Sequence, residues 1–188
     1  MRLVVAITGA TGAIYAMRLL EELKAKKVEV HLILSEWAEE TLRIEMNMKK
    51  ESLIELVDYY YLESDMTAPV ASGSFQHQGM IIIPCSMKTL SGIAHGYAEN
   101  LIIRAADVCL KECRRLILVP RETPLNAIHL DNMLKLAKLG VEIVPPMPAF
   151  YNHPVTIEEI VNQLIARILD QLGLEHNLVK RWGDTMKS

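Results

Sequence analysis

The 188-residue sequence contains few residues of the kinds that mark disulfide-rich or metal-binding proteins. Its three cysteines, Cys85, Cys109 and Cys113, cannot all pair with one another, and the last two have the four-residue spacing of a helix face. We therefore expect reduced thiols that are mostly buried, Cys85 among them rather than acting as a nucleophile. The six histidines form neither an H-E-x-x-H motif nor a close pair, so we predict no metal site.

Long apolar runs and an excess of positive charge are also missing. No apolar stretch approaches the length of a membrane span, and the first residues lack the pattern of a signal peptide. The net charge of −3 provides no electrostatic footprint for nucleic acid. We expect a cytoplasmic protein without a membrane or nucleic-acid partner, in which local basic clusters still allow acidic small ligands.

The length and the order of elements indicate one α/β domain spanning residues 1–188. Short aliphatic runs bounded by turn residues predict buried parallel strands. They are Arg2–Thr8, Val28–Leu34, Met80–Pro84, Leu116–Pro120 and Glu142–Pro145. Helical periodicity occurs between and after them, at Tyr15–Ala25, Met87–His95, Asn100–Cys113, Leu130–Leu139 and Thr156–Leu172. This alternation predicts a doubly wound parallel sheet in a three-layer αβα, Rossmann-like (flavodoxin-like) fold, with residues 51–78 partly irregular.

The turn after the first predicted strand, residues 8–13, has the composition of an anion cradle. Its glycines allow a tight turn that directs backbone N–H groups and the Thr11 hydroxyl towards an anion at a helix N-terminus. The sequence TGATGA is not the G-x-G-x-x-G dinucleotide fingerprint, and the second strand ends at Ser35 with no acid directly at its end. A mononucleotide phosphate is therefore favoured over NAD, and a plain strand-to-helix turn is the alternative.

Polar side chains follow the later strands as well. Ser86, Lys88 and Thr89 come after the third strand, where they form either a second anion cradle or an ordinary helix cap. The remaining strand ends supply a cation, a carboxylate and aromatic side chains: Arg121, Glu122, Phe150 and Tyr151. Because parallel strands end at one edge of a sheet, we expect these groups to converge there.

Several charged residues are ambiguous when judged by spacing alone. Arg104 and Lys111 are seven residues apart on one predicted helix face with Asp107 between them, which is typical of a solvated ion-pair cluster. A lone arginine such as Arg167 usually extends to solvent, and an acid such as Glu45 is usually a surface residue.

Longer motifs, taken in order along the chain, identify a family. They are TGATGA at 8–13, ASGS at 71–74, PCSMKTLSGIAHG at 84–96, RAADVCLKE at 104–112, LVPRETPLNAIHLDNMLKL at 118–136 and PPMPAFYNHP at 145–154. With them the chain resembles, nearly end to end, the UbiX-type flavin prenyltransferases, including those long named phenylacrylic or phenolic acid decarboxylases. The motifs PCSMKT and PPMPAFYNHP favour the phenolic-acid branch.

The resemblance implies a Rossmann-like flavoprotein that assembles as a dodecamer, with active sites where subunits meet. The implied ligand is reduced FMN. It would be held by Gly9, Ala10, Thr11, Ser35, Ser86, Met87, Lys88, Thr89 and Arg121. The family carries Ser in some members where this chain has Thr11, which keeps the hydroxyl group.

The resemblance also implies the second substrate and the reaction. Dimethylallyl phosphate would be bound by Tyr151, Arg167, Lys111 and Arg104, with Arg121 adding charge. Glu45, Glu122 and Thr11 would be the catalytic residues. Glu45 would manage protons on the leaving phosphate, and Glu122 would act near flavin N5. The dimethylallyl group would be joined to N5 and C6 of the flavin without a metal, and the product would serve a UbiD-type decarboxylase as its cofactor.

Other functions stay open at the level of sequence. A carrier that binds FMN without chemistry would need the same strand-end residues, and the older family name suggests direct decarboxylation of a phenolic acid. Flavin-dependent cysteine decarboxylases carry a PASANT-like motif where this chain has PCSMKT, so they are a distant alternative. Tyr15 and Trp182 are candidate aromatic surfaces that the sequence does not place.

Overall fold

The structure is a computed structural model that describes residues 1–181 and 183. The chain divides into two compact units, Met1–Pro145 and Pro146–Ser188. The single domain expected for residues 1–188 stays a prediction.

The first unit is built on a six-stranded sheet in which every pairing is parallel. In spatial order the strands are β3 (Tyr59–Leu62), β2 (Glu29–Leu34), β1 (Arg2–Ile7), β4 (Gly79–Cys85), β5 (Arg115–Pro120) and β6 (Glu142–Ile143). This is the Rossmann order, and the direction of winding reverses between β1 and β4. The prediction of a doubly wound parallel sheet is confirmed, and the β1–β4 junction is its topological switch point.

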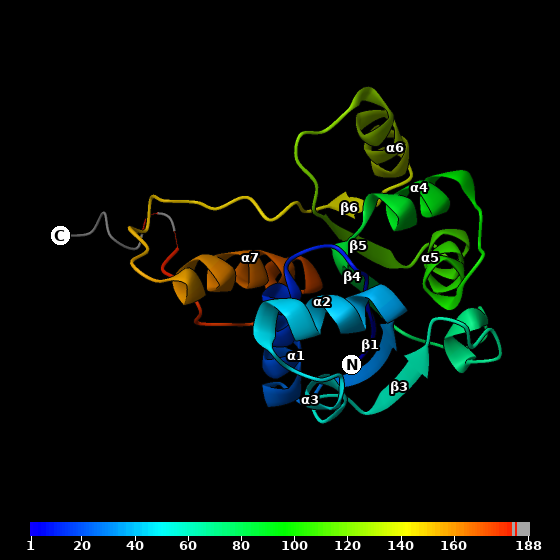
Figure 1. The fold of residues 1–188 in the computed structure, drawn as a ribbon, viewed down its shortest axis with the longest axis horizontal. Helices are drawn as coiled ribbons and strands as arrows, with labels where there is room; N and C mark the ends of the chain where they lie inside the picture. Colours follow the sequence, from blue (N-terminus) through cyan, green and yellow to red (C-terminus); the bar gives the residue numbers. More distant parts are fainter. Residues whose placement is uncertain (182, 184–188) are drawn as a thin grey trace. The chain divides into compact units, whose positions relative to one another are not determined.

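Helices cover both faces of this sheet (Figure 1). The connections of the first half are α1 (Ala13–Ala25), α2 (Glu36–Met46) and α3 (Glu51–Ile54), and α1 packs against α2 and against the sheet. The second half contains the short helix η1 (Pro69–Ala71), α4 (Met87–His95), α5 (Leu101–Lys111) and α6 (Ala127–Lys138). Because parallel crossovers are right-handed, winding outward in two directions places these two groups of helices on opposite faces.

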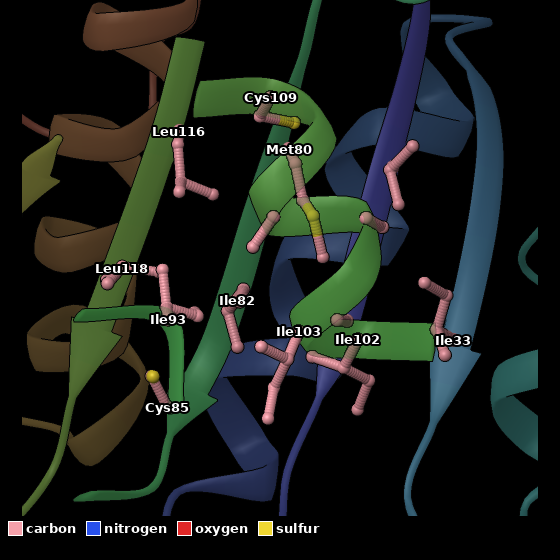
Figure 2. Packing of buried hydrophobic residues seen from close by; sticks show 14 of the residues in the cluster. Ile33, Met80, Ile82, Cys85, Ile93, Ile102, Ile103, Cys109, Leu116 and Leu118 are labelled. Carbon is pink, nitrogen blue, oxygen red and sulfur yellow. The ribbon is translucent and has the colours of Figure 1, made fainter. Parts of the chain in front are cut away.

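Alternate strand residues form the core beneath α4 and α5. Met80 and Ile82 of β4 face Ile93, Ile102 and Ile103 of the two helices, and all five are almost fully buried (Figure 2). Burial of each such side chain stabilises the fold by about 1.5–3 kcal/mol. The strands therefore form a rigid platform whose carboxyl ends are held at fixed positions.

Four elements, α2, α3, β3 and η1, were not expected from the sequence, and two of them border the site. Strand β3 is an edge strand made of partly exposed tyrosines, so it lacks the aliphatic run by which the other strands were predicted. Helix α2 buries little more than Ala38 and Leu42, so its apolar periodicity is faint. Its start is well defined, because the Ser35 hydroxyl oxygen accepts a hydrogen bond from Ala38 N at 3.1 Å.

The second unit contains one long helix, α7 (Ile157–Leu172). Thr156 and Glu159 form a reciprocal capping box at its start, and Gly173 ends it with a left-handed backbone at φ 69°. None of the helices in the described part of the chain is long and apolar enough to cross a membrane.

Candidate functional site

Thr8 joins the two strands that flank the switch point. Its hydroxyl group donates a 2.8 Å hydrogen bond to the carbonyl oxygen of Pro84 and accepts one of 2.8 Å from Ser86 N. Thr8 is only 3% exposed, so both bonds are shielded from water. The end of β1 is thus fixed to the start of α4, where Ser86 lies.

The N-terminus of α1 holds an acidic side chain from α2. Gly12 has a left-handed backbone with φ 115°, a conformation that favours glycine. Its N–H group and that of Ala13 donate to the Glu45 carboxylate at 3.0 and 2.9 Å. In this structure the N–H groups of the turn are occupied by the side chain of Glu45, and the predicted binding of a ligand anion stays a prediction. The helix dipole of α1 stabilises a negative charge at this position.

Gly9 lies where α2 approaches the same loop most closely. A Cβ atom at Gly9 would be 2.3 Å from the Cβ atom of Trp37, so only glycine fits. The hydroxyl group of Thr41 donates to Gly9 O at 3.3 Å, which attaches α2 to the loop. The indole of Trp37 is largely exposed beside it.

The N-terminus of α4 is the second predicted cradle. The Ser86 hydroxyl oxygen accepts a hydrogen bond from Thr89 N at 3.3 Å and the group donates to the Thr89 hydroxyl at 3.1 Å. Lys88 forms a 2.9 Å ion pair with Glu99, whose hydrogen bond raises the pKa of the Lys88 ammonium group. The ordinary cap is therefore present, and any anion bound here would rely on helix N–H groups and hydroxyls before it engaged Lys88.

Arg121 and Tyr15 meet at the end of β5. The backbone N–H of Arg121 donates to Cys85 O at 3.2 Å, and the Tyr15 ring lies against Gly12. Burial raises the pKa of the Tyr15 hydroxyl, and the charge of Arg121 partly opposes that shift. Tyr15 thus lies within the electrostatic reach of Arg121, whereas Trp182 lies outside the described residues.

The carboxyl edge of the sheet therefore brings together most of the predicted site residues. They are Gly9, Ala10, Thr11, Ser35, Ser86, Met87, Lys88, Thr89, Arg121 and Glu122, with Glu45 added from the end of α2. Glu122 is exposed and accepts a hydrogen bond from Thr123 N at 3.0 Å. Their predicted roles towards a ligand stay predictions.

Arg104 and Lys111 are both on α5, and each is held by partners of its own. Arg104 donates to Ala71 O at 3.1 Å and pairs with Asp107 at 2.8 Å. Lys111 forms an ion pair with Glu112 at the end of α5. Strand β5 begins shortly afterwards at Arg115, which is paired with Gly79 at the start of β4. The chain therefore places Lys111 towards the amino edge of the sheet, opposite to the edge that carries Arg121.

The second unit carries the two other predicted phosphate ligands. Tyr151 is in an exposed loop, and Arg167 is an exposed residue of α7. Nη1 of Arg167 lies 3.1 Å from Oδ2 of Asp170. The residue that interrupts the amphipathic pattern of α7 is thus held by an acid on the same helix.

Comparison with known proteins assigns the family. The Flavoprotein family model matches residues 1–169. A probable UbiX-like flavin prenyltransferase of a Streptomyces species is 56% identical over 97% of this chain and 92% of its own length. The chain belongs to the UbiX-like flavin prenyltransferases.

Solved structures of this family have the same fold. A dodecameric FMN-dependent UbiX-like decarboxylase from Escherichia coli is 53% identical, covers 97% of this chain and 99% of its own, and superposes with a TM-score of 0.95. AnUbiX in complex with FMN and dimethylallyl pyrophosphate is 48% identical over 97% of both chains, also with a TM-score of 0.95. The family predicted from the motifs is confirmed.

Nucleophilic chemistry is not supported for Cys85 or Cys109 of this UbiX-like chain, and Cys113 is exposed outside the site. Cys85 and Cys109 are buried, and burial raises the pKa of both thiols, that of Cys109 to about 12. Both are therefore neutral at physiological pH. Within the described residues, no group of three or more His, Cys, Asp or Glu side chains is arranged to hold a metal ion.

Sequence reasoning missed three features of the site. Thr8 was included in the turn, but its link to Ser86 depends on a strand pairing 76 to 78 residues away. Trp37 contacts Gly9 only because α2 folds back over the loop. The place of Glu45 at α1 depends on the same packing, so no local signal could have shown it.

Proposed function

We propose that the chain transfers a dimethylallyl group from dimethylallyl phosphate to N5 and C6 of reduced FMN. The product is the prenylated cofactor of a UbiD-type decarboxylase, and the activity is cytoplasmic. The observation that carries this proposal is the edge built around Thr8, where the ends of β1 and β4 hold the N-termini of α1 and α4 together and Arg121 follows β5. The FMN and allylic pyrophosphate complex of AnUbiX supports the choice of substrates.

The residues at this edge fit a flavin mononucleotide. The start of α4 offers helix N–H groups and the Ser86 and Thr89 hydroxyl groups to a phosphate. Because Gly9 has no side chain, its backbone is exposed at the same edge. When bound, reduced FMN supplies the nucleophilic N5 and the neighbouring C6. The charge of Arg121 acts on the half-buried Tyr15, and a cation near an aromatic ring suits a flat, partly anionic ring system.

The acidic residues of the edge handle protons. Glu45 sits on the N–H groups of Gly12 and Ala13 with Thr11 in the same turn, and it manages protons on the departing phosphate. Glu122 follows Arg121 directly and acts near flavin N5. Because an allylic group gains cationic character as its phosphate leaves, a fixed carboxylate nearby stabilises the transition state.

Donor binding requires cations from more than one part of the assembly. Tyr151 and Arg167 bind the donor phosphate, and Arg104 and Lys111 complete the site of an adjoining copy, because Lys111 lies towards the amino edge of the sheet in its own chain. Such sharing fits a dodecamer, the state described for the relative from Escherichia coli. Basic groups from two subunits then stabilise the leaving phosphate.

The first experiment is anaerobic incubation of the purified protein with reduced FMN and dimethylallyl phosphate, followed by mass spectrometry of the released flavin. We expect a gain of one five-carbon unit. The diphosphate donor is run in parallel. Flavin of unchanged mass with both donors would contradict prenyl transfer and leave the FMN carrier. Consumption of a phenolic acid without a partner protein would instead support direct decarboxylation.

Variants separate catalysis from carriage. Glu122→Gln and Arg167→Ala should still bind FMN but lose prenyl transfer. Mixing Lys111→Ala subunits with Glu122→Gln subunits during refolding should restore part of the activity, because some shared sites then contain both native residues. Mixtures as inactive as the separate variants would contradict the sharing of sites. The matched control is Glu21→Gln, which removes an exposed 3.2 Å ion pair with Arg18 on α1.

A further inference from the structure

Asp170 is the centre of an ionic cluster on the last turn of α7. Its carboxylate lies 3.1 Å from Nη1 of Arg167, 2.8 Å from Nη2 of Arg181 and 3.1 Å from Nε2 of His176. Nη1 of Arg181 adds a contact at 3.3 Å. One carboxylate thus joins a predicted phosphate ligand to two residues of the segment that follows α7.

The histidine of this cluster is a fixed hydrogen-bond donor. Its side chain is 1% exposed, and its Nδ1 accepts a hydrogen bond from Leu178 N at 3.4 Å. With Nδ1 as the acceptor, the Nε2–H group is the donor to Asp170. The pKa of Asp170 is lowered, mainly by the hydrogen bond from Arg181 and to a smaller extent by that from His176. This carboxyl group is therefore ionised at neutral pH.

The same C-terminal segment is attached to the loop that carries Tyr151. Nδ2 of Asn152 donates to the carbonyl oxygen of Lys180 at 3.1 Å, and Ala149 N donates to Oε1 of the buried Gln163 on α7 at 3.0 Å. The segment from Leu174 to Arg181 therefore contacts Asn152, which follows Tyr151 in the sequence. It also contacts Asp170, the ion-pair partner of Arg167.

The cluster directs Arg167 without cancelling its charge. Asp170 engages Nη1 only, and Nε and Nη2 of Arg167 have no hydrogen bond to any described residue. Two guanidinium groups share one carboxylate, so the three side chains keep a net charge of +1. A guanidinium held by one nitrogen presents its others in a fixed fork, the geometry that a phosphate binds in bidentate fashion.

We infer that Asp170 and the C-terminal segment Leu174–Arg181 are positioning elements of the donor-phosphate site, with Asp170 orienting Arg167 and the segment holding the Tyr151 loop against α7. This inference rests on the proposed function, because it takes Arg167 and Tyr151 as phosphate ligands. An isolated surface ion pair would contribute little. The Asp170 cluster differs in having three donors, a buried histidine and links to two separate elements.

A double-mutant cycle tests the inference by calorimetric binding of dimethylallyl phosphate to full-length protein loaded with oxidised FMN, in which no turnover occurs. Asp170→Asn should raise the Kd for the donor about tenfold, equivalent to about 1.4 kcal/mol, and leave the Kd for FMN unchanged. Arg181→Ala should act in the same direction, and Arg181→Lys should partly restore affinity. Glu21→Gln, the matched i,i+3 control, should bind as the wild type does.

The Arg167→Ala background decides the mechanism. If Asp170 acts through Arg167, the Arg167→Ala, Asp170→Asn double variant binds no more weakly than Arg167→Ala alone. An additional loss in the double variant, or wild-type affinity in Asp170→Asn, would overturn the positioning role. Wild-type affinity in Arg167→Ala would instead overturn the phosphate site of the proposed function, so the two failures are distinguishable.

Discussion

Replacing Thr8 by valine should weaken both the fold and flavin binding. Valine has nearly the same shape but removes the hydroxyl group that bonds Pro84 O and Ser86 N at 2.8 Å each. In the variant, Pro84 O still accepts a 3.3 Å hydrogen bond from the backbone N–H of residue 8, whereas the N–H of Ser86 has lost its acceptor. One orphaned donor and one lost hydrogen bond together cost about 2–3 kcal/mol.

The expected shift is large enough for a thermal melt. For a chain of this size, 1 kcal/mol corresponds to about 2–4 °C, so Thr8→Val should melt about 4–12 °C below the wild type. Protein and FMN concentrations must be matched, because ligand binding and assembly also shift Tm.

Thr8→Ser is the control for this substitution. It keeps both hydroxyl bonds and loses one methyl group, worth about 1 kcal/mol. Because Ser86 caps the helix proposed to bind the FMN phosphate, Thr8→Val should also raise the Kd for FMN more than Thr8→Ser does. A valine variant that melts at or above the serine variant would refute the reasoning.

Three further predictions follow from close contacts and buried charges. Gly9→Ala should lower Tm and FMN affinity together, because a Cβ 2.3 Å from that of Trp37 forces α2 away, at about 1–3 kcal/mol. Burial lowers the pKa of His31 and His77 below 6.5, so the free energy of unfolding should fall as the pH drops below that value. A His31→Gln, His77→Gln variant should show a weaker pH dependence of the urea midpoint across pH 5.5–7.5. The pKa of Asp170 is lowered below 3.8, so the stability that its ionised form contributes is present above pH 3.8 and is lost as the pH falls further. Hydrogen exchange of the C-terminal segment should therefore speed up below pH 3.8, and Asp170→Asn should abolish this pH dependence.

Much of the fold was predictable because the central strands have a clear sequence pattern. The buried runs of β1, β2, β4 and β5 are continuous and aliphatic, as strands covered on both faces must be. The rule that ligands bind beyond the carboxyl ends of parallel strands then identifies the loop at Gly9, the Ser86 cap and Arg121 from the sequence alone. Local sequence and topology agree at these positions.

The remaining features depend on packing between distant segments. Strand β3 is held by pairing with β2 rather than by an apolar pattern of its own, and α2 is placed by its contacts with α1 and Gly9. The contact of Glu45 with Gly12 joins residues 33 positions apart, so no local spacing rule predicts it. The Asp170 cluster depends on a segment without regular structure folding back on α7, which periodicity does not report.

Of the five cations assigned to the two ligands, four share one property that Arg121 lacks. Each has an acidic partner in the structure: Lys88 with Glu99, Arg104 with Asp107, Lys111 with Glu112, and Arg167 with Asp170. Arg121 has no ion pair within the described part of the chain. Exposed pairs of this kind contribute at most about 1 kcal/mol, so little free energy is lost when a phosphate shares their cations. The acids therefore orient these four cations before the donor arrives, whereas Arg121 is held through its backbone, whose N–H group donates to Cys85 O at the end of β4.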